Sequence, residues 1–141
     1  ANWSNLSDAP FKENIEENVK GLEFIEKLRP VTYNMSVHKV EQFIENHYGE
    51  VDSSDWPSKY DKEQIRYTGF IAQEVEEAAK ELGYDFSGVD APKNDKDFYG
   101  LRYAEFVVPL VKGMQEQQEQ IAALQRALES QQLVIAALQE K

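Results

Sequence analysis

The strongest periodic signal along the chain lies in its last third, where apolar or glutamine side chains recur at alternating steps of three and four residues. Such heptads predict one continuous helix with a seam along one face. At roughly 1.5 Å per residue, a helix over 107–141 is about 50 Å long and outruns a small body, so we expect a parallel coiled coil. The seam residues are Val107, Leu110, Met114, Gln117, Ile121, Leu124, Leu128, Gln131, Ile135 and Leu138.

The number of helices in this bundle is not fixed by the heptads. The first seam position of each heptad is mostly β-branched or long and the second is mostly leucine, which favours two strands. The flanking positions carry glutamine, alanine and valine in place of opposed charges, which suits a wider bundle. Gln117 and Gln131 would form polar layers that fix the register. Dimer and trimer stay open, and the simpler alternative is a stripe that covers the core of its own chain.

The first part of the chain predicts a helix followed by a strand. Residues 7–28 carry apolar side chains at helical spacing, as one helix kinked at Gly21 or as two short ones. The Arg29-Pro30 pair should end it, because a residue before proline is pushed out of the helical region. Alternation of apolar and polar residues then predicts a strand over 31–37.

A second strand and a second helix are expected in the middle of the chain. Residues 67–71 have strand character, and residues 72–82 favour a helix that Gly83 can end. We interpret 38–66 as a polar insertion with a weak helical signal, and 84–97 as a loop.

The predicted fold class is therefore α+β, a small globular domain of short strands and helices followed by a long C-terminal helix in a coiled coil. The predicted divisions are a junction segment 1–12, a globular domain 13–106 with an insertion about 38–66, and a coiled-coil stalk 107–141.

Composition and charge exclude several classes of function. Hydrophobic residues make up 41% of the 141 residues, enough for a core, and the net charge of −11 lies almost entirely before Phe106. No basic cluster is present to overcome repulsion by phosphates, so nucleic acid is not an expected partner. The chain lacks cysteine, which excludes disulfides, thiolate metal sites and cysteine nucleophiles. It has no apolar run that could span a membrane and no signal-peptide pattern, so any such signal is expected in a longer parent.

Four motifs together carry a family resemblance. They are SDAPFKENI from Ser7, LRPVTY from Leu28, GFIAQEV from Gly69, and a fourth stretch running from Tyr99 to Val111. In order and spacing, over nearly the whole chain, they resemble the endosialidase-type intramolecular chaperone autoprocessing domain found at the C-termini of phage tail spikes and fibres. Residues 38–66 are the least similar part.

The resemblance implies a homotrimer, which decides the stoichiometry that the heptads leave open. It further implies a module that promotes folding of a fibrous domain upstream in the same polypeptide and then cuts itself off with a Ser-Lys dyad. Carried over by motif, the dyad is Ser7 and Lys12 and the cut bond is Leu6-Ser7. No cofactor or metal is implied. The expected setting is a phage tail-fibre or tail-spike precursor made in the bacterial cytoplasm.

The chemistry of such a dyad is sound. A serine hydroxyl becomes a good nucleophile when a neighbouring base removes its proton. A lysine can be that base only when neutral, and its ordinary pKa of about 10.4 means that burial or nearby positive charge must favour the neutral form. Trimer packing is the expected source of that burial. Pro10 stands where many relatives have arginine, which removes a positive group between the two residues, so we expect slow or absent cutting.

Other interpretations of these residues are also open. Ser7-Asp8 followed by Pro10 is the pattern of a helix start, with no catalytic role. His38 and His47 lie in the polar insertion without a third nearby ligand, so a metal site is not expected. The whole module could be a permanently attached oligomerisation tip without protease activity. Similar domains also occur in bacterial surface proteins and in a membrane-anchored eukaryotic transcription factor, so the parent is not fixed.

Overall fold

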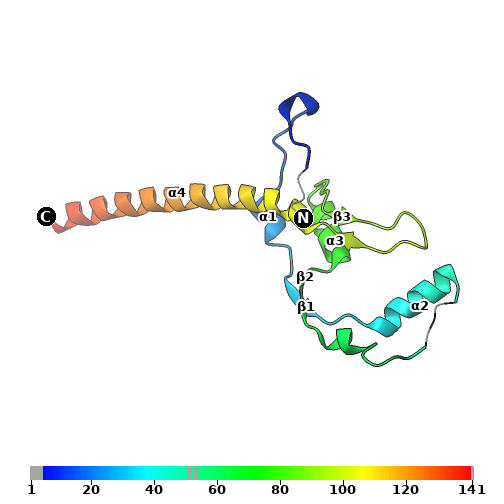
Figure 1. The fold of residues 1–141 in the computed structure, drawn as a ribbon. Coiled ribbons are helices and arrows are strands. Elements are labelled where there is room, and N and C mark those ends of the chain that lie inside the picture. The colour runs from blue at the N-terminus through cyan, green and yellow to red at the C-terminus, as the bar shows by residue number, and fades with distance from the viewer. Residues whose placement is uncertain (1–4, 51, 53, 141) are drawn as a thin grey trace.

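The fold is a small α+β body from which a long helix and a side arm extend (Figure 1). The computed structural model describes residues 5–50, 52 and 54–140, so the ends of the predicted junction segment and stalk at residues 1–4 and 141 lie outside the described residues. In chain order the elements are η1 (Ala9–Phe11), α1 (Leu22–Ile25), β1 (Val31–Tyr33), α2 (Val37–Tyr48), η2 (Asp61–Gln64), β2 (Tyr67–Gly69), α3 (Ala72–Glu81), β3 (Val89–Asp90), β4 (Gly100–Leu101), η3 (Tyr103–Phe106) and α4 (Val107–Gln139).

The two predicted strands exist and pair with each other. β1 and β2 run antiparallel with Val31 opposite Gly69 and Tyr33 opposite Tyr67, and the two tyrosine rings stack with centroids 5.8 Å apart. The first strand is shorter than predicted, because Ser36 caps a helix: its Oγ accepts a hydrogen bond from the backbone N–H of Lys39. Val37 therefore starts α2.

Part of the predicted loop 84–97 is instead a strand. β3 pairs antiparallel with β4, Val89 opposite Leu101, and the Arg102 guanidinium makes two hydrogen bonds to the Asp90 carboxylate across the pair. Strands of two residues are too short to give an alternating signal, so the pattern of the sequence missed this hairpin.

An aromatic cluster forms the core of the body. Phe24 from α1 is fully buried and its ring lies 4.9 Å from that of Phe86, which in turn meets Phe106 at 4.9 Å. The apolar face of α3 covers this cluster with Val75, Ala78 and Ala79.

The predicted helix over 72–82 and its stop at Gly83 are confirmed. Gly83 has a φ of 59°, and its N–H donates to the carbonyl of Lys80 while the N–H of Tyr84 donates to that of Ala79. This pair of bonds satisfies carbonyls that the helix end leaves free, and glycine tolerates the left-handed backbone without strain.

The helix predicted over residues 7–28 is wrong for most of its length. Only Leu22–Ile25 form an α-helix, and Ala9–Phe11 form a single 3-10 turn. Asn14 has a φ of 52°, a left-handed conformation that no helix continues through. Residues 5–18 are exposed, so Ile15 at the start of the apolar stripe has no surface of its own chain to bury against, whereas Ile25 and Leu28 at its end pack against the core.

α4 is one uninterrupted helix of 33 residues that leads away from the body (Figure 1). Pro109 stands in its first turn, where the missing N–H would have had no helical partner. Gly113 is buried where the chain at Gly21 crosses the helix, and a Cβ on Gly21 would lie 2.9 Å from the backbone nitrogen of Gly113. Only Pro109 and Gly113 are buried along Val107–Gln139, so the alternative of a stripe that covers its own core is wrong.

Candidate active site and assembly surface

The 3-10 turn near the N-terminus brings Ser7 and Lys12 together. Two backbone hydrogen bonds close the turn, from Phe11 N–H to the Asp8 carbonyl and from Lys12 N–H to the Ala9 carbonyl, both 3.1 Å. The Nζ of Lys12 then donates to the Oγ of Ser7 at 2.8 Å. A spacing of five residues thus becomes direct contact between the two side chains that the family motif picks out.

The helix-start interpretation of Ser7-Asp8 is not realised as a side-chain cap. Asp8 is the residue that precedes the 3-10 turn, but its side chain makes no capping hydrogen bond. Ser7 lies one residue further out, with its hydroxyl on Lys12. Pro10 occupies the first turn, where its fixed φ suits the backbone.

The Ser7-Lys12 pair is open to solvent within a single chain, together with the adjoining Leu6. In this contact the Lys12 amine donates and the Ser7 hydroxyl oxygen accepts. For the same two atoms to act as base and nucleophile, the lysine must be neutral and accept the proton of the hydroxyl. The single chain therefore brings Ser7 and Lys12 into contact but does not bury them.

The seam of α4 forms a long exposed apolar surface. All ten seam residues lie on the exposed surface of the helix, and the apolar ones range from 48% exposed at Ile121 to 73% at Met114. Contiguous apolar surface on this scale is typical of a protein-protein interface. Sequence reasoning found these residues from their spacing alone.

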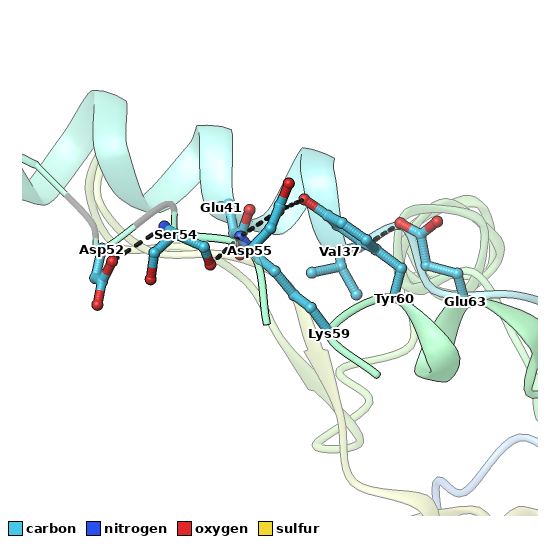
Figure 2. A network of polar contacts seen from close by, with 8 residues as sticks. All are labelled: Val37, Glu41, Asp52, Ser54, Asp55, Lys59, Tyr60 and Glu63. Atoms are coloured by element: carbon cyan, nitrogen blue, oxygen red, sulfur yellow. Dashed lines mark hydrogen bonds and ion pairs between the residues drawn. The ribbon is translucent and has the colours of Figure 1, made fainter. Parts of the chain in front are cut away.

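The segment 37–66, hereafter the arm, leaves the body at β1 and returns at β2, and a buried lysine holds it together (Figure 2). The side chain of Lys59 is only 1% exposed, and its Nζ lies 3.0 Å from the Glu41 carboxylate of α2 and 3.8 Å from Asp55. The ammonium also sits over the rings of Trp56 and Tyr60 at 5.1 and 5.3 Å. The hydrogen bond to Glu41 raises the pKa of Lys59, so this lysine stays charged.

Further contacts close the arm around this lysine. The Tyr60 hydroxyl donates to Asp55 at 3.1 Å, and burial is the main cause that raises the pKa of this phenol. The Glu63 carboxylate accepts from the Val37 N–H at 2.7 Å and so caps the start of α2 (Figure 2). A region predicted as a polar insertion therefore has a specific internal structure.

The far end of α2 contacts the loop between β3 and β4. The Tyr48 hydroxyl donates to the carbonyl of Lys96 at 2.7 Å, and the ring of Phe43 meets that of Phe98 edge to face at 6.3 Å. Both histidines of the arm have aromatic neighbours: His38 stacks on Tyr60 and His47 on Phe43. The arm is thus attached at its tip as well as at its stem.

Sequence reasoning missed Lys59, because a lone lysine in a polar stretch is ordinarily a solvated side chain. The available signal was the spacing of its neighbours. Asp55, Trp56 and Tyr60 supply one carboxylate and two rings within five residues of Lys59, which is the set of groups that can shelter a buried ammonium.

Comparison with known proteins agrees with the motifs. A family model described as chaperone of endosialidase matches residues 7–84, more than half of the chain. The chain belongs to this family. The match spans the Ser7-Lys12 turn, both strands of the β1-β2 pair and α3, and membership supports a chaperone role in general terms. No curated protein and no solved structure matches the chain.

Within residues 5–50, 52 and 54–140, every helix is too short or too polar to span a bilayer. The same part of the chain holds no group of three or more histidine or acidic side chains arranged for a metal ion.

Removing the charge of Lys59 should loosen the arm. We expect Lys59→Met to leave the partly buried Glu41 carboxylate without this ion pair and to speed amide hydrogen exchange across 37–66, with little change in α3. Lys62→Met is the matched control, since Lys62 is an exposed lysine of η2 in the same arm, and it should leave exchange unchanged. Equal exchange in the wild type and both variants would contradict a structural role for the buried lysine.

Proposed function

We propose that this chain is a C-terminal intramolecular chaperone that forms a homotrimer through α4 and directs the folding and assembly of a fibrous domain upstream in the same polypeptide. The observation that carries the proposal is the exposed heptad seam of a 33-residue helix in a member of the chaperone of endosialidase family. A helix of this length with so little of its surface buried gains its stability from association. The three-fold state rests on the family resemblance, and a dimer is the alternative that the heptads leave open.

Trimer formation should depend on the middle of the seam. Leu124→Asp is expected to dissociate the assembly, since a buried leucine is worth about 2–5 kcal/mol and each trimer would also bury three charges. Leu133→Asp is the matched control, because Leu133 lies on the same helix, is exposed and falls outside the seam. Sedimentation equilibrium of the 16.2 kDa chain decides between states. A wild-type monomer at micromolar concentration would remove the proposal, and a dimer would remove the three-fold state.

Chaperoning follows from the way in which trimerisation would act on the chain upstream. Three α4 helices in register would bring three bodies, and hence three N-terminal segments, to one end of the bundle. A fibre of intertwined chains can fold only after its three chains are aligned. If α4 has already joined the chains, much of the entropic cost of bringing them together has been met. The body and its arm would hold the fibre end, because they lie at the N-terminal end of α4. The setting that fits is a phage tail-fibre or tail-spike precursor, with a bacterial surface protein as the alternative.

The chaperone role predicts that a parent protein lacking part of the module misassembles. Deletion of residues 107–141, or of the whole module, should leave the three parent chains out of register. A parent that carries Leu133→Asp should assemble normally. The yield of SDS-resistant trimer of the upstream domain measures the outcome. A parent truncated before Ala1 that still gave this trimer in normal yield would show that the module does not chaperone.

Self-cleavage is a second, separable activity of the proposal. Neutral Lys12 would take the proton of the Ser7 hydroxyl, and the oxygen would attack the carbonyl carbon of Leu6. The Leu6-Ser7 peptide bond then breaks as Lys12 passes the proton to the Ser7 nitrogen, which becomes a free amine. Water hydrolyses the resulting ester between Leu6 and the Ser7 oxygen, which gives a carboxylate at Leu6 and restores the Ser7 hydroxyl. The 2.8 Å contact of Nζ and Oγ supports this assignment. The alternative is a tip that stays attached and never cuts.

Cleavage at Leu6-Ser7 should be slow or absent in the natural chain. The test expresses the module behind its natural upstream segment and follows its mass over days, alongside Ser7→Ala, Lys12→Ala and Pro10→Arg. A new N-terminus at Ser7 that disappears in both alanine variants would establish the dyad, and we expect Pro10→Arg to accelerate it. Cutting that persists without Ser7 would identify a contaminating protease, and no cutting in any variant would leave an assembly clamp only.

A further inference from the structure

The turn that carries Ser7 and Lys12 also carries large apolar side chains with nothing to cover them. Leu6, Phe11 and Ile15 are 81%, 67% and 77% exposed, within a run of residues 5–18 that is exposed throughout. Exposed apolar side chains scattered singly need no explanation, but three in ten residues around a candidate dyad do. This run of residues 5–18, hereafter the loop, projects away from the body (Figure 1).

The path of the chain between this loop and the body fixes the side of α4 on which the loop emerges. At Gly21 and Leu22 the chain contacts α4 around Gly113 and Glu116. Further back, Glu16, Glu17 and Val19 border a groove with Val108, Val111, Lys112 and Gln115. The N-terminal segment therefore crosses the back of α4, away from the seam, from the flank of Gly113 to the opposite flank of Val111.

These two flanks are the ones that meet between neighbouring helices of a parallel coiled coil. Counting heptads from Val107 and Leu110, Val111 follows a seam residue and Gly113 precedes one, so the first occupies the flanking position e and the second the flanking position g. In a parallel bundle the e flank of one helix faces the g flank of the next. A loop that leaves α4 on the Val111 flank is thus directed at the neighbour's Gly113 flank, where the neighbour's own α1 packs.

We propose that Phe11 and Ile15 pack against the Gly113 flank of the neighbouring subunit and thereby bury the Ser7-Lys12 pair. This inference rests on the proposed trimer. It makes Phe11 and Ile15 positioning residues, whose partner surface is a second copy of this chain. The groove beside Val108 and Val111 lies on the flank from which the loop emerges, and the seam-remote Val108 is more than half exposed there. Each candidate site would then be complete only when the next subunit is in place.

Thiol protection tests this packing, and the absence of cysteine from the chain makes the labelling clean. Phe11→Cys and Ile15→Cys are each made in the wild type and in the Leu124→Asp background, with Asp95→Cys in an exposed loop as the control position. Reaction with a maleimide is followed by mass. We expect both thiols to react about tenfold or more slowly in the trimer than in the dissociated chain, because they react only when the interface opens. The control should react equally in both.

The outcomes separate this inference from the proposed function. Equal reactivity of the thiols introduced by Phe11→Cys and Ile15→Cys in the trimer and in the dissociated chain would overturn the packing while leaving the trimer intact. Protection in both states would mean that the loop folds onto its own chain, which also overturns it. A wild-type chain that sediments as a monomer would overturn the proposed function and this inference together.

Discussion

The close crossing of the chain at Gly21 over α4 at Gly113 is the contact on which the rest of the structure depends. It joins the two ends of the sequence, since it packs the segment after the Ser7-Lys12 turn against the first turns of the long helix. Directly after it, Phe24 enters the aromatic core with Phe86 and Phe106. A side chain at Gly21 would collide with the backbone of α4 at Gly113 and push the two segments apart, so the junction, the core and the start of α4 depend on one another.

The parts of this fold that the sequence predicted are those with a repeated local signal. The heptads of α4, the helix former over Ala72–Glu81 with its glycine stop, and the pair of short strands were all recovered from spacing and propensity. The first helix was not, because the periodicity around Ile15 describes a face that the single chain does not bury. The β3-β4 hairpin and Lys59 were missed because long-range contacts define them and local pattern does not.

The candidate site could be predicted only through its family motif. Composition and spacing alone favoured a helix start at Ser7 and Asp8, and nothing local distinguishes Lys12 from other exposed lysines. The motif identified Ser7 and Lys12 as candidates, and the 3-10 turn places the Lys12 Nζ 2.8 Å from the Ser7 Oγ. The local backbone thus explains why Ser7 and Lys12 are in contact. Whether the pair is buried depends on neighbouring chains, which a single chain does not show.

The length of α4 beyond its contact with the body has a kinetic consequence. Its outer part, from about Gln117 to Gln139, is exposed along its seam and has no packing partner among the described residues of its own chain. A helix of that size without tertiary contacts is only marginally stable in water. In the proposed assembly, winding of the outer helix and encounter with other chains would therefore be one event, whose rate rises with more than the first power of chain concentration. Nascent chains held close together would complete it far sooner than the same chains diluted through a cell.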